Sequence, residues 1–374
     1  MFDQFALQLA LSITGKKPGP LFTEMTGMSI RAGERLSKFP EGDTRIRRSV
    51  VAQFARVNEC SMDEAIQHFA DLPSVREQRP SPLADYVAIS PRFDQSRKNY
   101  ARSLRLAQEL DEYSRHYMQL RSTEDGFTKF REYLLATGHG KPEFFADLNE
   151  RDFDAPRLWS EFHAAQSWED ARASLHAFIW NALLDWLACW DLEFCMDWIP
   201  NRIPNPLFTL VTPSVSEEIL EQETVTLDKK RNWYRLPIDR LIDVTSVLVS
   251  GVRNRSIPKK KPLLKTFAAW ARVEPQWLAN VRTGERKLTL RRFCSLWETA
   301  IVRGTDPNIG PPIPLFVAAH AFTVLLVRQH RPGHIAQIVT VNEDRYRTMW
   351  KSHRDAVIEA GAKPGTRPWP KILG

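Results

Sequence analysis

The sequence predicts a mainly α-helical protein of several domains, with two helix-turn-helix units and a third candidate unit. Along most of the chain, apolar residues recur at intervals of three and four, as on the buried face of a helix. The length of 374 residues exceeds one ordinary hydrophobic core, so two or three packed domains are expected. Proline-rich stretches interrupt the helical pattern and suggest where those domains meet.

The breaks divide the chain into four expected segments. Residues 1–72 form a first helical unit, and a Pro- and Ser-containing linker follows it over 72–93. Residues 94–223 are predicted to be a helical, acidic, Trp-rich central domain, and 224–305 a basic helix-turn-helix domain. A last helical segment is expected over 313–361.

The clearest helix pair is expected between Leu264 and Ala300. A second helix should start after Glu274-Pro275, because the missing N–H of proline would have no partner at the first helical position. The two helices would bury apolar residues at helical spacing, namely Phe267, Ala268, Ala271, Val273, Leu278 and Val281. Thr289 is expected to cap the helix that follows.

The opposite face of the second helix carries side chains suited to DNA. The amides of Gln276 and Asn280 can make paired hydrogen bonds to adenine in the major groove. Cations that could neutralise phosphates follow, with Gly284 as the expected end of the helix; they are Arg282, Arg286, Lys287, Arg291 and Arg292. A short helical hairpin with a solvated basic face would have the same spacing.

This segment resembles the Cro/C1 (Xre-like) helix-turn-helix family. The resemblance rests on the two apolar sets, the short turn and the Gly-containing basic loop after the second helix. It implies a recognition helix starting at Pro275 that enters the major groove of double-stranded DNA. In one departure, Arg272 stands at the turn position that family members often fill with Gly.

A weaker copy of the pattern lies near the N-terminus, within residues 21–70. Gly27 falls at the turn, but Gly33 replaces the core residue at the position of Leu278, which weakens the second helix. The copy would direct Arg31, Arg35 and Lys38 towards the duplex. A small helical bundle is the alternative interpretation.

A third match covers His334 to Trp350. Its apolar spacing is as good as the first, with Asn342 as the expected cap of a second helix. Arg345 and Arg347 would then face DNA. The segment could equally serve as a packing module or a partner surface.

The charge is unevenly distributed along the chain. The formal net charge is +7 and the isoelectric point near 9.2. Residues 143–223 contain 4 Lys and Arg against 16 Asp and Glu, whereas residues 224–303 contain 18 against 6. A basic DNA-binding domain joined to an acidic domain of another role would show this division.

The acidic centre is predicted to pack through its tryptophans. Ile179, Trp180, Leu183, Leu187 and Trp190 have the spacing of a buried helix, which could also form a homodimer or partner interface. The other side of that helix is expected to be solvated by Asp185, Asp191, Glu193 and Asp197.

Three connecting segments are also assigned from the pattern. A short strand is expected at Leu207–Val211 and a short helix over 214–223. The cations between Arg253 and Lys261 could form a flexible arm against DNA or a solvated linker.

Enzyme, metal and membrane classes find no support in the sequence. The nucleotide-binding and serine-hydrolase glycine motifs are missing, and His330 and His334 are separated by a helix-breaking Arg-Pro-Gly. The four cysteines form no C-x-x-C pair, so no catalytic residue, metal or cofactor is assigned. Mean hydropathy of −0.38 and a start unlike a secretory signal lead us to expect a cytoplasmic protein without a membrane span.

Together these features predict a sequence-specific DNA-binding protein that acts as a transcriptional regulator. The alternative is a helical interaction scaffold, or the DNA-binding component of a replication, maintenance or defence complex, because one motif serves many functions.

Overall fold

The computed structural model describes somewhat more than half of the chain. The residues that it describes are 9, 12, 13, 15, 101–147, 155–198, 206–212, 214–215, 234–256, 258, 260–301, 310–328 and 335–360.

These residues are mainly α-helical, as the sequence predicts. The first group of helices is α8 (Ala101–Leu120), α9 (Gly126–Leu135), α10 (Arg157–Ala164) and α11 (Arg172–Trp198). The second is α13 (Pro237–Asn254), α14 (Leu264–Trp270), α15 (Pro275–Arg282), α16 (Leu290–Ala300), α17 (Ile313–Arg328) and α18 (Ile335–Glu359). Short elements connect them: the 3₁₀ turns η1 (Pro142–Phe145) and η2 (Phe208–Val211), and the antiparallel pair β1 (Ser214–Val215) and β2 (Tyr234–Arg235).

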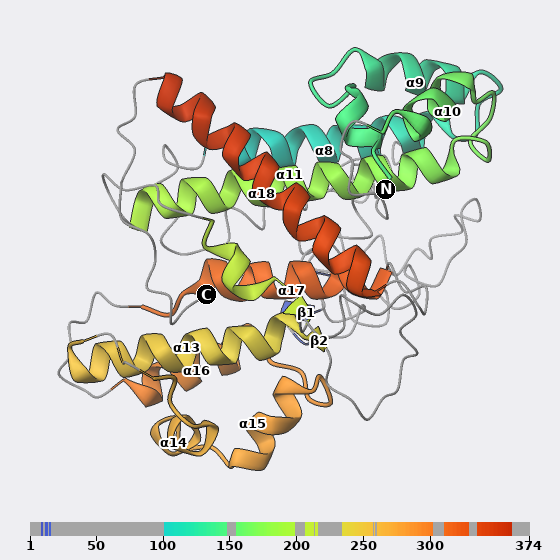
Figure 1. Cartoon of the computed structure of the whole chain (residues 1–374). Helices are drawn as coiled ribbons and strands as arrows, with labels where there is room; N and C mark the ends of the chain where they lie inside the picture. The colour runs from blue at the N-terminus through green and yellow to red at the C-terminus, as the bar shows by residue number, and fades with distance from the viewer. Residues whose placement is uncertain are drawn as a thin grey trace, which may run out of the picture.

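Helix α11 forms the centre of the first group. It packs against α8 on one side and α18 on another, and α10 and η1 complete its surroundings (Figure 1). The sequence is apolar nearly all round the helix, and Trp180, Trp186 and Trp190 are buried. The prediction that these tryptophans belong to a core is therefore confirmed.

The predicted solvation of the acidic side of α11 is wrong. Asp185, Asp191 and Glu193 are all buried, because helices and loops cover this side as well. Their carboxylates accept hydrogen bonds from those elements, which offsets part of the cost of burying charge. Glu193, for example, accepts from the backbone N–H groups of Arg102 and Ser103 at 2.9 and 3.1 Å, in the first turn of α8. Burial still raises the pKa of Asp191 to about 7 and raises the pKa of Glu193.

The third helix-turn-helix candidate is also wrong. The segment forms α18, a single uninterrupted helix, so residues around Asn342 make neither a turn nor a cap. Tyr346 is fully buried, and its hydroxyl donates to Asp191 of α11 at 2.5 Å. The segment is thus a packing helix, which was the alternative interpretation.

The predicted strand at Leu207–Val211 is replaced by η2. Asp191 accepts from the backbone N–H groups of Leu207 and Phe208, both at 2.9 Å, and so caps the start of the 3₁₀ turn. Of the helix expected over 214–223, the first two residues form β1 and the rest lie outside the described residues.

The α13–α16 group lies at the opposite end of the view from α8–α10 (Figure 1). Helix α17 packs on α13 and on η2, whereas α18, which follows it, packs on α11. The last helices thereby contact both parts of the molecule. Within the described residues, no helix combines the length and the apolar character that a membrane span needs.

Candidate nucleic-acid interface

Helices α14 and α15 meet at the turn that the sequence predicts. The N–H of Arg272 donates to the carbonyl of Ala269 at 3.3 Å, and that of Val273 to the carbonyl of Ala268 at 3.0 Å. These two hydrogen bonds define the Schellman motif at the end of a helix. The motif requires a residue with a left-handed backbone conformation just after the helix. Arg272 is that residue, with φ of 53°. A side chain in this conformation costs roughly 1 kcal/mol relative to glycine.

Helix α15 is fixed to the protein by its inner face. It starts at Pro275 as predicted, and Leu278 and Val281 are fully buried. Arg282 forms ion pairs with Asp239 and Asp243, which lie one turn apart on α13. Its guanidinium, expected to meet phosphate, is therefore already engaged in holding α15 against α13.

The outer face of α15 presents the two predicted base-reading amides. Gln276 is exposed and Asn280 half-buried, and Gln276 Nε2 donates to Asn280 Oδ1 at 2.8 Å. This bond leaves the Gln276 oxygen as an acceptor and the Asn280 nitrogen as a donor. A ligand that approaches α15 thus meets one fixed acceptor beside one fixed donor.

The loop after α15 is anchored so that its cations point outwards. Gly284 has φ of 79° and ends the helix, as expected. The N–H of Arg286 then donates to the carbonyl of Asn280 at 2.9 Å, and Leu288 is buried. Arg286 and Lys287 between these anchors are exposed.

Helix α16 adds two more exposed cations at its start. Thr289 caps the helix by accepting from the N–H of Arg292 at 3.4 Å, as predicted. Arg291 is exposed, and the exposed Arg292 lies over the ring of Trp277, 5.5 Å from its centroid. This cation–π contact holds Arg292 beside the outer face of α15.

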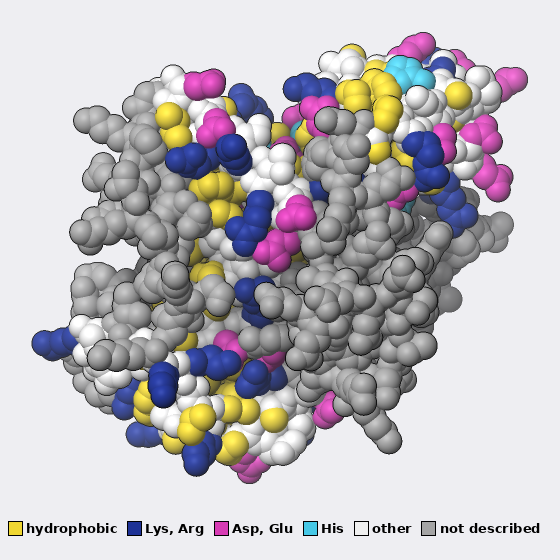
Figure 2. Space-filling view, in the orientation of Figure 1, with side chains coloured by type: hydrophobic (Ala, Val, Ile, Leu, Met, Phe, Trp, Pro, Cys, Tyr) yellow, Lys and Arg dark blue, Asp and Glu magenta, His cyan; other side chains and the backbone are white. Residues whose placement is uncertain are grey.

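Two exposed cations of the same surface were not assigned from the sequence. They are Lys265 in the first turn of α14 and Arg272 in the turn before α15. Both lie at the ends of the first helix of the predicted pair. This position could have identified them from the sequence. Figure 2 shows Lys and Arg side chains gathered over this part of the molecule.

The predicted basic arm is partly folded into the helices. Arg253 belongs to the last turn of α13, where its guanidinium donates to the carbonyl of Ala300 at 2.7 Å and lies 5.0 Å from the ring centroid of Trp270. Lys261 pairs with Asp243 at 2.7 Å. Both are therefore restrained by contacts within the protein.

Two further predicted site residues, Arg345 and Arg347, are not brought to this surface. Arg345 is buried and donates to the carbonyl of Ala146 and to Asn181 Oδ1, so its assignment to DNA is wrong. Arg347 is exposed on α18 and pairs with Glu343 at 2.8 Å. The N-terminal candidates lie outside the described residues; they are Arg31, Arg35 and Lys38.

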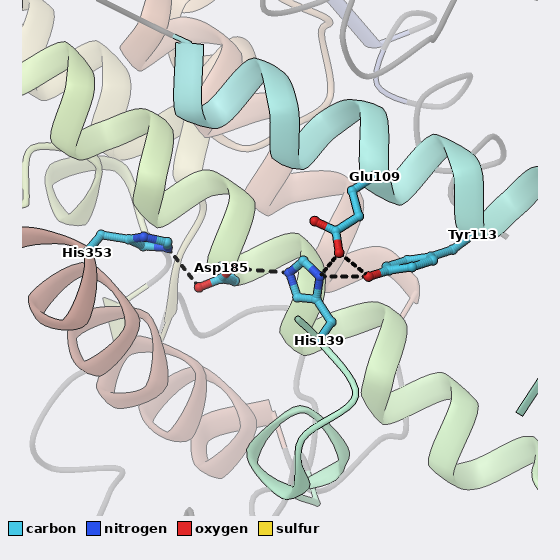
Figure 3. A network of polar contacts seen from close by, with 5 residues as sticks. All are labelled: Glu109, Tyr113, His139, Asp185 and His353. Carbon is cyan, nitrogen blue, oxygen red and sulfur yellow. Dashed lines mark hydrogen bonds and ion pairs between the residues drawn. The ribbon is translucent and has the colours of Figure 1, made fainter. Parts of the chain in front are cut away.

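A separate polar network joins the helices of the first group (Figure 3). Asp185 of α11 contacts His353 of α18 at 2.8 Å and His139, from the segment after α9, at 3.4 Å. The other ring nitrogen of His139 lies 3.3 Å from Glu109 and 3.0 Å from the Tyr113 hydroxyl, both of α8. Three helices are thereby connected through ionisable side chains.

The pKa values of this network favour opposite charges in its centre. Burial by itself lowers the pKa of His139, but hydrogen bonds to Asp185 and Glu109 outweigh it and raise the pKa to about 9. Burial by itself raises the pKa of Asp185, yet the bonds from His139 and His353 hold it at about 2. Because the network joins α8, α11 and α18 through buried and half-buried side chains, we assign it a structural role. Among the residues described, no group of ligands that could hold a metal ion is found.

Replacing His139 by glutamine should flatten the pH dependence of stability between about pH 6.5 and pH 9. The folded chain binds the imidazole proton more tightly than the unfolded chain does. The resulting stabilisation is complete below the unfolded pKa of about 6.5 and is lost as the pH rises through about 9. It amounts to roughly 3 kcal/mol. Urea unfolding of both chains near the two ends of this pH range measures the difference.

The exposed His163 of α10 provides the control. A His163→Gln chain should keep the pH slope of the parent protein. If His139→Gln lost the same free energy at both ends of the pH range, the protonated network would be disproved.

Comparisons with known proteins assign neither a family nor a function to the chain. No protein-family model, curated protein or solved structure matches the chain. What the protein binds is therefore argued from its own residues.

Proposed function

We propose that this protein binds double-stranded DNA in a sequence-specific manner, with α15 as the helix that enters the major groove. In this proposal α14, its turn and α15 form a Cro/C1-like helix-turn-helix. Gln276 and Asn280 read base edges, and the surrounding exposed cations neutralise phosphates.

The observation that carries the proposal is the amide pair on the outer face of α15. The inner face of the helix is buried and ion-paired to α13, so the outer face is held in a fixed orientation. Paired amides with one acceptor and one donor suit the N6 and N7 edge of adenine.

The surrounding charge supports a polyanionic partner. In the part of the chain that the structure describes, no Asp or Glu forms an ion pair with Arg286, Lys287 or Arg291. Glu274 and Glu285 are exposed on the same stretch, but the exposed cations outnumber them and give a local positive potential that attracts phosphates. A protein scaffold of mixed surface charge would not require it.

Replacing Gln276 by alanine tests the base-reading role. The loss should be roughly 1 to 3 kcal/mol on a selected site and close to zero on random duplex, because the contact is to a base edge. Selection of bound fragments from a random duplex library gives the site, and titrations of both duplexes give the two affinities.

A matched control is Gln166→Ala, since Gln166 is an exposed glutamine between α10 and α11. This chain should bind both duplexes like the parent protein. Equal losses on selected and random DNA for Gln276→Ala would remove its base-reading role, and no binding of any duplex would refute the proposed function.

We further propose that the bound sites regulate transcription. Recovery of bound fragments from genomic DNA distinguishes this use from replication or maintenance, because promoters would recur in the first case and replication origins in the second. Absence of DNA from all recovered complexes would favour the scaffold alternative.

A further inference from the structure

Arg272 has an unusual backbone for an arginine. Among the described residues other than glycine, only Arg272 and Arg255 have positive φ, at 53° and 50°. Both are exposed, and both follow the last turn of a helix, α14 and α13 respectively. Glycine is the residue that such helix endings favour, because it has no Cβ to clash.

The arginine side chain at position 272 has no packing role that would explain this choice. It is exposed, and it takes part in none of the ion pairs or ring contacts found between described residues. The backbone bonds of the turn would form equally well with glycine, since they use only N–H and carbonyl groups. A strained residue that the fold does not need points to a function of its side chain.

The position of Arg272 relative to α15 suggests that function. The residue lies in the turn three residues before Pro275, the start of α15, whereas Arg286 and Lys287 follow the helix, so cations stand beyond both of its ends, together with Glu274 and Glu285. An α-helix with its side chains is about 10 to 12 Å across, close to the width of the major groove of B-DNA, so a helix in the groove has a phosphate strand along each side. Phosphates line both edges of that groove, one strand on each side.

We infer that Arg272 contacts a backbone phosphate at the edge of the groove opposite to the one that Arg286 and Lys287 meet. The inference rests on the proposed function, because it needs a duplex at α15. It adds a residue that fixes how far α15 can turn or slide in the groove, which base contacts alone would leave adjustable.

The test compares stability and affinity in an Arg272→Gly chain. Relief of the backbone strain should raise the apparent unfolding temperature by about 1 to 3 °C. Loss of one phosphate contact should weaken binding to a mixed-sequence DNA duplex by roughly 3- to 10-fold and reduce the slope of log K against log salt by about 1. The two effects have opposite signs, which a damaged fold would not produce.

Arg255→Gly is the matched control, with the same substitution, backbone conformation and charge change. Arg255 lies about 18 Å further along the axis of α13 than Asp243 and about 24 Å further than Asp239, the two residues that pair with Arg282 of α15. It should gain stability in the same way and keep the affinity and salt slope of the parent protein. An Arg272→Lys chain should retain most of the affinity, because it keeps the charge.

Three outcomes would overturn the inference. Arg272→Gly could bind the mixed-sequence duplex with the affinity and salt slope of the parent protein, which would remove the phosphate contact alone. Arg255→Gly could lose as much affinity as Arg272→Gly, which would indicate an effect of net charge. A parent protein that bound no duplex would refute the proposed function itself, so the two failures are distinguishable.

Discussion

A chain with Arg286, Lys287 and Arg291 all replaced by alanine should bind mixed-sequence duplex DNA roughly 100-fold more weakly than the parent protein at moderate salt. Each side chain is exposed, and the loop and helix that carry them are anchored to the core. Loss of three phosphate contacts should reduce the slope of log K against log salt by about 3. Fluorescence titrations at several salt concentrations measure both quantities.

The control removes three cations elsewhere on the surface. Lys141, Arg172 and Lys351 are exposed and belong to the part of the molecule centred on α11. Their triple alanine chain has the same net charge as the first variant and should lose less than a few-fold in affinity. Equal losses in the two chains would mean that total charge, and not the surface around α15, attracts DNA.

Replacing Asp191 by alanine should destabilise the protein by about 3 to 5 kcal/mol. The carboxylate is fully buried and accepts from two backbone N–H groups, of Leu207 and Phe208, and from the hydroxyl of Tyr346. Without it, these three donors and the Cys195 thiol would lose their acceptor, and η2 and α18 would each lose one polar link to α11. Urea unfolding, followed by far-ultraviolet circular dichroism, measures the loss.

Two further variants distinguish the stability lost with the hydrogen bonds from the stability lost with side-chain volume. Tyr346→Phe removes one donor and should cost about 1 to 2 kcal/mol. Cys189→Ala removes a small buried side chain from the same helix and should cost about 1 kcal/mol. If Asp191→Ala cost no more than Cys189→Ala, the carboxylate would not be the link between these elements.

Local signals in the sequence were sufficient to predict the helix pair formed by α14 and α15. Pro275 and Thr289 each begin a helix through a mechanism that involves only neighbouring residues, and both starts are confirmed. The failed third candidate shows the limit of apolar spacing. Intervals of three and four are shared by a helix pair and by one long helix, and no Pro or Gly interrupts α18.

The partners of charged residues could not be predicted in the same way. Asp191 is buried because Leu207, Phe208 and Tyr346 supply donors, and the first two are separated from the third by well over 100 residues. Arg282 is held by Asp239, 43 residues earlier. Such pairings depend on the packing of distant elements, so an acidic or basic face in a sequence does not reveal whether water or protein covers it.

Helices α17 and α18 together contact both parts of the molecule, and this limits where the chain can be truncated. A fragment that stopped after α16 would contain the whole surface around α15, yet it would strip the apolar cover from α13 and leave Phe293 without Phe316, whose ring it stacks on at 4.9 Å. The helices of the proposed DNA-binding surface are thus completed by sequence that follows them. Any shortened form intended for crystallisation or binding work should extend to the end of α18, and a frameshift late in the reading frame would disable both parts of the molecule together.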